Sequence, residues 1–104
     1  MLFLKQEPIP SNEAFTDGLI TFTNVIKSDY PQAKIALLCP YSLTDSQCLN
    51  IKNAAYSTDT IYYRLNSSAI TTLGCDGHPS YSSQQNLAAL VIPLVKKMFA
   101  LQYY

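Results

Sequence analysis

Hydrophobic positions recur along residues 11–30 with the spacing of an α-helix. Ser11 is a residue type that commonly caps a helix N-terminus. An apolar stripe follows it at intervals of three and four residues: Phe15, Leu19, Phe22 and Ile26. Because Pro31 disfavours helical geometry in the residue before it, the pattern predicts a helix that ends near Tyr30.

Two short apolar runs predict strands. Residues 33–39 read Ala-Lys-Ile-Ala-Leu-Leu-Cys, which is typical of a strand buried on both faces in a parallel sheet. Residues 60–65 read Thr-Ile-Tyr-Tyr-Arg-Leu, whose β-branched and aromatic side chains favour a second strand. We expect the two strands to be adjacent and parallel, with an open edge on the first one.

Two further helices complete the predicted α/β pattern. A weak helical pattern covers residues 45–56, and Ser80 is the expected N-cap of a last helix. The apolar stripe of that last helix consists of Leu87, Val91, Leu94, Val95 and Met98. Pro93 lies inside it and should cost about 3 kcal/mol unless a kink absorbs it. We expect the stripes of the first and last helices to pack on the sheet, and residues 1–10, with two prolines, to form an N-terminal loop.

Composition narrows the class of protein. The chain has 104 residues, of which 48% are hydrophobic and 13% charged, as in a single globular domain. Seven Lys and Arg residues balance seven Asp and Glu residues, so we expect no nucleic-acid partner. The longest apolar run, residues 87–94, contains a proline and is far shorter than the roughly 20 residues that a membrane span needs. We therefore expect no membrane partner.

The three cysteines, Cys39, Cys48 and Cys75, follow no zinc-finger spacing. They are consistent with buried thiols, or with one disulfide and one free thiol in an exported protein. For a disulfide we expect the pair Cys48–Cys75, because both lie in or beside predicted loops whereas Cys39 ends a buried strand. Asn66-Ser67-Ser68 also matches the acceptor sequence for N-glycosylation.

One segment, residues 74–80, carries candidate chemistry: Gly-Cys-Asp-Gly-His-Pro-Ser. Its His78 is the only histidine and lies in a loop between a strand and a helix. Pro79 favours extended geometry at His78, and Gly77 can adopt unusual dihedral angles, which would fold Asp76 back toward the imidazole. A histidine near both a helix N-terminus and a carboxylate is suited to general-base catalysis near neutral pH. The alternatives are a surface or capping histidine, or a metal ligand beside the cysteine; we expect no metal and no cofactor.

Residues 74–80, followed by an amphipathic helix, resemble the last conserved block of SGNH (GDSL-type) hydrolases. They are most similar to the acetyl xylan esterases of carbohydrate esterase family 2. The upstream residues 27–35, Lys-Ser-Asp-Tyr-Pro-Gln-Ala-Lys-Ile, are similar to that family's entry into its fourth strand. The resemblance covers residues 11–102 and implies the C-terminal part of a three-layer α/β/α, flavodoxin-like fold with a parallel sheet.

The resemblance also implies a division of roles. His78 would be the general base that activates a serine toward an acetylated carbohydrate, and Asp76 would be its orienting partner. Gly77 stands where the family often has an aromatic residue beside the substrate. The nucleophile and oxyanion blocks of the family, Gly-Asp-Ser and Gly-x-Asn-Asp, are not in this sequence. Residues 11–104 would then be a partial domain, inactive alone, with the N-terminal part of the domain as its partner; such a protein would be secreted.

Two other interpretations remain open. In the first, Ser42 would be the nucleophile, because it follows the first strand. Its surroundings, Pro-Tyr-Ser-Leu, however, lack the small residues of a nucleophile turn. In the second interpretation, the chain is a non-catalytic α/β remnant that binds a protein or a carbohydrate. In that case tyrosines would stack on sugar rings, with the candidates Tyr62, Tyr63, Tyr103 and Tyr104.

Overall fold

The computed structural model describes residues 10–100. Three helices, α1, α2 and α3, span Asn12–Asp29, Asp45–Thr58 and Tyr81–Ala100. Two strands, β1 and β2, span Ala36–Cys39 and Ile61–Arg64. Two single 3-10 turns, η1 (Ser67–Ala69) and η2 (Cys75–Gly77), lie between β2 and α3. The expectation of a mixed α/β fold is confirmed, and the predicted loop over residues 1–10 lies outside the described residues except for Pro10, which has no regular structure.

The two strands form a parallel pair. Ala36 lies opposite Ile61 and Cys39 lies opposite Arg64, with α2 as the connection between the strands. Both strands are shorter than the apolar runs that predicted them, but their adjacency and direction are as expected. Within the described residues the sheet contains only these two strands, so the outer edge of β1 is open, as expected, and so is that of β2.

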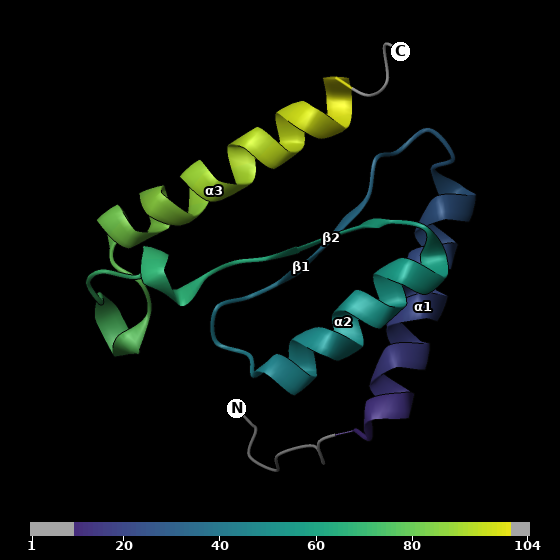
Figure 1. The fold of residues 1–104 in the computed structure, drawn as a ribbon, viewed down its shortest axis with the longest axis horizontal. Coiled ribbons are helices and arrows are strands. Elements are labelled where there is room, and N and C mark those ends of the chain that lie inside the picture. Colours follow the sequence, from purple (N-terminus) through teal and green to yellow (C-terminus); the bar gives the residue numbers. More distant parts are fainter. Residues whose placement is uncertain (1–9, 101–104) are drawn as a thin grey trace.

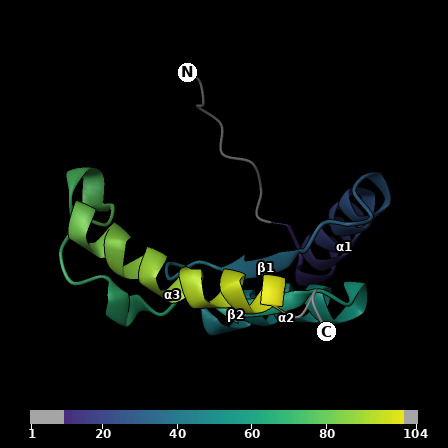
Figure 2. The same ribbon diagram turned by 90° about the horizontal axis from the view of Figure 1, so that it is seen from above.

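The helices cover both faces of the sheet. Figure 1 shows α1 and α2 on one side of the strands and α3 on the other. α2 contacts both strands and α1 packs against α2, whereas the backbone of α3 comes close to η1. Figure 2 shows that α1 extends outward beyond the β1 side of the sheet.

Local hydrogen bonds fix where the first two helices begin. Ser11 Oγ accepts the N–H of Ala14 at 3.1 Å, which confirms the predicted cap of α1. At α2, Thr44 Oγ1 accepts the N–H of Gln47 at 3.2 Å, and Gln47 Oε1 accepts the N–H of Thr44 at 2.9 Å. This reciprocal capping box satisfies two N–H groups that a helix start otherwise leaves unpaired. It stabilises the first turn of α2, whose apolar pattern is weak.

The core lies between α2 and the sheet. Its buried residues are Cys39, Cys48 and Ile51, and the half-buried Leu19, Leu37, Leu43 and Tyr62 pack around them. Of the predicted α1 stripe, Leu19 joins this core, but Phe15 and Phe22 remain 38% and 62% exposed. The expectation that the whole stripe packs on the sheet is therefore wrong. The reason is that α1 lies against α2, burying Thr23, while no strand lies beneath its two phenylalanines.

The last helix packs on the sheet only in part. Met98 is buried, and it lies beside Ile35 and Ile61 at the amino ends of the strands. Three other residues of the predicted stripe, Leu87, Val91 and Leu94, are half-buried. Val95 is exposed instead, as are Ile92 and Phe99, so one apolar side of α3 faces outward.

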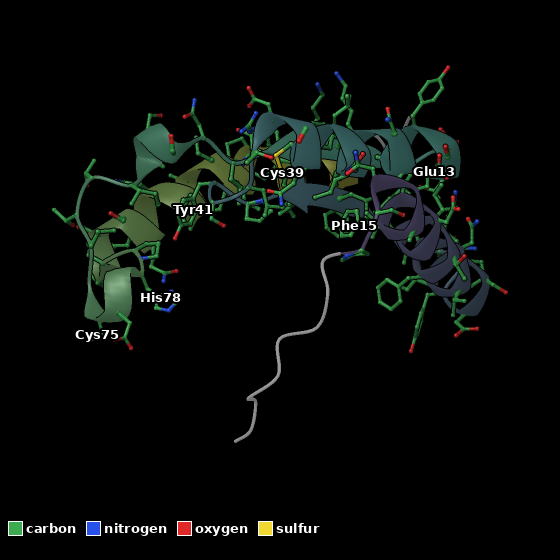
Figure 3. All side chains as sticks on the ribbon, turned by 90° about the horizontal axis from the view of Figure 1, so that it is seen from below. Glu13, Phe15, Cys39, Tyr41, Cys75 and His78 are labelled. Carbon is green, nitrogen blue, oxygen red and sulfur yellow. A yellow bond between two sulfur atoms is a disulfide. The ribbon has the colours of Figure 1, made fainter. Side chains whose placement is uncertain are left out.

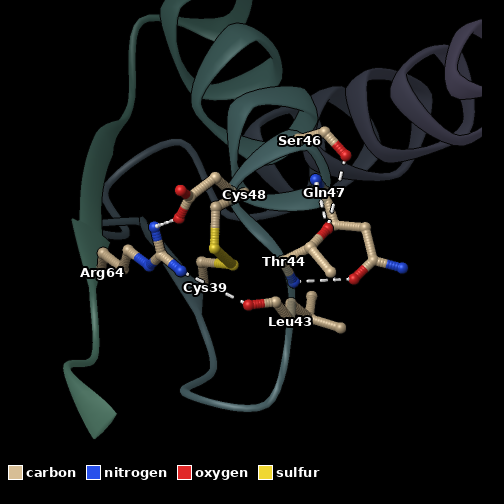
Figure 4. Close-up of a disulfide and its surroundings, with 8 residues drawn as sticks. Cys39, Leu43, Thr44, Ser46, Gln47, Cys48 and Arg64 are labelled. Atoms are coloured by element: carbon tan, nitrogen blue, oxygen red, sulfur yellow. Dashed lines mark hydrogen bonds and ion pairs between the residues drawn. A yellow bond between two sulfur atoms is a disulfide. The ribbon is translucent and has the colours of Figure 1, made fainter. Parts of the chain in front are cut away.

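A disulfide joins Cys39 to Cys48, with a Cα–Cα distance of 5.5 Å (Figure 4). The predicted Cys48–Cys75 bridge is wrong, and Cys75 is free and exposed in the turn after β2. Cys39 forms the disulfide although it is buried, because it faces the first turns of α2, where Cys48 is also buried. Arg64 forms an ion pair with Asp45 and a hydrogen bond to the carbonyl of Leu43, so the same loop is also tied to β2.

The disulfide should contribute measurably to stability. Replacing Cys39 and Cys48 together by serine is expected to lower the free energy of unfolding by about 2–3 kcal/mol, since the bridge restricts a short loop of the unfolded chain. Urea denaturation of the oxidised protein measures this difference. Cys75→Ser is the matched control, and it should change stability by less than about 0.5 kcal/mol because the residue is exposed. Equal stability of all three proteins would contradict the assignment of the bridge.

Candidate functional site

The candidate site lies at the carboxyl ends of the two parallel strands. The loop after β1 carries Tyr41 and Ser42, and the segment after β2 carries residues 65–80 before α3 begins. Open parallel sheets commonly place ligand-binding and catalytic groups at this end. His78 lies in the last turn of the second segment, as the sequence predicts.

A tight turn presents His78. The N–H of His78 donates to the carbonyl of Cys75 at 3.0 Å, and the two residues between them have positive φ, +54° at Asp76 and +71° at Gly77. Two successive positive φ values within such a hydrogen-bonded turn are the type I′ pattern, for which Asp-Gly is a preferred sequence. The Asp76-Gly77 pair therefore has a local structural role that sequence reasoning missed, although the Asp-Gly dipeptide is a signal that could have found it.

The two arms of the turn pair with each other. The N–H of Gly74 donates to the carbonyl of His78 at 2.6 Å, and the N–H of Ser80 donates to the carbonyl of Thr72 at 3.1 Å. Between these bonds Leu73 and Pro79 form an antiparallel bridge. His78 itself is extended, with φ −76° and ψ 158°, as expected for a residue that precedes proline. The backbone that carries the imidazole is thus held on both sides.

Ser83 anchors this turn to the helix that follows. It is fully buried, and its Oγ accepts the N–H groups of Thr71 and Thr72, both at 3.0 Å, and donates to the carbonyl of Thr72 at 2.8 Å. Ser80 Oγ accepts the N–H of Ser83 at 3.2 Å, which confirms Ser80 as the cap of α3. Sequence reasoning missed Ser83, because it follows Ser82 directly and the sequence does not indicate which of the two serines is buried.

The side chains of the candidate catalytic residues are exposed. Asp76, Gly77 and His78 all lie on the surface. Within residues 10–100 no hydrogen bond or ion pair joins Asp76 to His78, so the predicted orienting contact is not formed. Ser42 is exposed in the other loop, and no hydrogen bond between it and His78 occurs in this part of the chain.

The turn projects toward the open edge of the sheet. Figure 3 shows His78 and Cys75 at the end of this turn, extending to the same side of the ribbon as Phe15 and Tyr41. Figure 2 shows the same arrangement from above, with the turn and α1 both reaching past β1. The candidate base, the open edge of β1 and the exposed part of α1 therefore share one side of the molecule.

The described residues provide no metal centre of an ordinary kind. No group of three or more His, Cys, Asp or Glu side chains is placed to hold a metal ion between residues 10 and 100. In the same part of the chain, no helix has the length and hydrophobicity to cross a membrane.

No family model, no curated protein and no solved structure matches this chain.

The anchoring role of Ser83 is testable. Ser83→Ala should lower the free energy of unfolding by about 1–3 kcal/mol, because two backbone N–H groups lose a part-buried acceptor. Amide hydrogen exchange at Thr71 and Thr72 should become faster. Gln85 of the same helix provides the control, since it is exposed and Gln85→Ala is expected to change stability by less than about 0.5 kcal/mol. Unchanged exchange at both amides in Ser83→Ala would show that the anchor is not needed.

Proposed function

We propose that this chain is the C-terminal part of an SGNH-type carbohydrate esterase and that it supplies the catalytic histidine, His78. The proposal combines the resemblance of residues 74–80 to that family with the position of the turn. The observation that carries it is that His78 is exposed at the carboxyl end of a parallel sheet, on the side of the open edge of β1. Strands added at this edge would end on the same side as the imidazole.

The character of β1 supports the addition of further strands. β1 reads Ala-Leu-Leu-Cys, with no polar side chain, whereas β2 includes two tyrosines and an arginine. Such an apolar strand is typical of the interior of a parallel sheet, whose strands are covered on both faces, and an exposed edge is a site for pairing with another strand. The exposed Phe15 and Phe22 of α1 would gain partners from such an addition.

The distribution of helices is also consistent with the proposal. In a unit of two parallel strands joined by a helix, the connecting helix covers one face of the sheet, and α2 does so here. α1 lies on that same side, and α3 covers the opposite face (Figure 1). The structure is thus compatible with one end of a three-layer α/β/α domain that has additional strands beyond β1.

In this mechanism the imidazole of His78 takes the proton of a serine hydroxyl supplied by the added part. The serine oxygen attacks the acetyl carbonyl carbon, the bond from that carbon to the sugar oxygen breaks, and the imidazolium gives its proton to this departing oxygen. Water then releases acetate from the serine by the same sequence, with His78 again as base. Proton transfer of this kind needs a separation of about 2.6–3.2 Å between the heavy atoms, so the described part alone has no partner for His78.

Asp76 and Gly77 have separate roles in this proposal. Asp76 lies two residues before His78 and would reorient toward the imidazole only if its side chain rotates, because no contact joins them in this structure. Gly77 has a positive φ, and a Cβ atom at this residue would meet no atom within 4 Å outside its two chain neighbours, so the space beside Gly77 is open. We expect His78 to be essential for turnover and Asp76 to be an auxiliary residue.

The alternative is a non-catalytic binding module that uses the open edge of β1 for a protein partner. The exposed edge and the phenylalanines of α1 favour protein over carbohydrate. Of the tyrosines considered for sugar stacking, Tyr62 and Tyr63 are half-buried in β2, and Tyr103 and Tyr104 lie outside the described residues. The assay below separates this alternative from the esterase.

The 104-residue chain alone should hydrolyse an aryl acetate no faster than a free histidine background. A fusion with an N-terminal segment that carries the Gly-Asp-Ser and Gly-x-Asn-Asp blocks of a family 2 esterase should gain activity. In that fusion His78→Ala should lower kcat/KM by at least about 100-fold, the usual contribution of a general base. Asp76→Asn should reduce it less, because asparagine also tolerates positive φ and a serine–histidine pair suffices.

Tyr41→Phe in the same fusion is the control, because it changes a residue near the carboxyl ends of the strands and leaves His78 in place. Serine-dependent turnover by the isolated chain would show that it is not a partial site. Full activity of the His78→Ala fusion would reject the esterase assignment and leave the binding module.

A further inference from the structure

Asn66 begins a sequence to which the proposed esterase assigns no role. Asn66-Ser67-Ser68 is the only place in the chain where asparagine is followed two residues later by serine or threonine. This is the acceptor sequence for N-glycosylation, which modifies surface loops of exported proteins. The structure places it between the end of β2 and η1, and all three residues are exposed.

The local geometry leaves the acceptor nitrogen available. Asn66 Oδ1 accepts the N–H of Ser68 at 2.9 Å, so the asparagine side chain turns toward the residue that carries the required hydroxyl. Among residues 10–100, Asn66 Nδ2 donates to no protein group. Asn66 also borders a surface recess with Tyr41 and Arg64, so the space beside it is open.

The disulfide is an independent indication of the compartment. Cys39 and Cys48 are bonded and both almost fully buried, at 0% and 2% exposure. Disulfides that are part of a core form and persist in oxidising compartments, and they are rare where thiols are kept reduced. The secretory lumen is such a compartment, and it is also where N-glycans are attached. The disulfide and the acceptor sequence therefore point to the same place of maturation.

We propose that Asn66 carries an N-linked glycan in a chain that matures in an oxidising secretory compartment. The donor is an oligosaccharide linked to a lipid diphosphate. A bond forms between Asn66 Nδ2 and the anomeric carbon of the first sugar, and the bond from that carbon to the diphosphate oxygen breaks. Nδ2 loses one proton and the lipid diphosphate leaves, with no change of oxidation state.

The position of Asn66 is compatible with strand pairing at the outer edge of β1. Asn66 follows β2, whereas the edge proposed for pairing with further strands is the outer edge of β1. A glycan at Asn66 would therefore leave the β1 edge free for pairing. The proposal does not depend on the esterase, since it rests on the acceptor sequence, its exposure and the disulfide.

The test is expression of the full chain behind a cleavable secretion signal in eukaryotic cells. Intact mass before and after treatment with peptide N-glycosidase should show one glycan, whose release converts Asn66 to aspartate. A thiol titration of the denatured, unreduced protein should find one free thiol, that of Cys75. A secreted wild-type chain with an unmodified mass, or with three free thiols, would overturn the proposal.

Three variants localise the modification. Asn66→Gln and Ser68→Ala should each abolish the glycan, the second without altering the asparagine. Ser67→Ala preserves the acceptor sequence and should keep the glycan, which separates loss of the acceptor from disturbance of η1. A glycan retained in Ser68→Ala, or lost in Ser67→Ala, would contradict the assignment.

Discussion

The packing of α2 across both strands is the interaction on which the rest of this structure depends. α2 connects β1 to β2, contacts both, and packs against α1. The bond from Cys48 to Cys39 also joins this helix covalently to the end of β1, and a two-stranded sheet is marginal in water without such packing. The two-stranded sheet nevertheless does not extend under α1, so Phe15 and Phe22 have no strand beneath them. These side chains and the open edge of β1 favour association with a further polypeptide segment.

Much of the fold was predictable from the sequence because its signals are local. Ser11 and Pro31 bound α1, and the apolar runs identified both strands and their direction. The orientation of α1 was not predictable, because its apolar residues follow a helical period whichever surface covers them, and only the neighbours decide which residue is buried. The choice of Cys39 over Cys75 for the disulfide also depends on α2 crossing above β1, which is a tertiary contact and leaves no local pattern.

The candidate site, like the fold, was predictable from the sequence only in part. The place of His78 and its extended backbone follow from Pro79 and were expected. The expected contact of Asp76 with the imidazole was not found, and the Asp-Gly turn supplies a physical reason for aspartate at this position that needs no catalysis. Ser83 anchors the turn through hydrogen bonds to residues eleven and twelve positions earlier in the chain, so residue spacing alone does not reveal this role.

The short sequence separation of the disulfide has a consequence for how the chain reaches this structure. Cys39 and Cys48 are nine positions apart, so closing their loop costs little chain entropy and needs only β1 and the start of α2. Strand pairing, by contrast, joins residues 25 positions apart, as Ala36 and Ile61 are. During synthesis the bridge can therefore form before β2 has left the ribosome, and a covalently closed β1–α2 unit is then the template on which β2 docks.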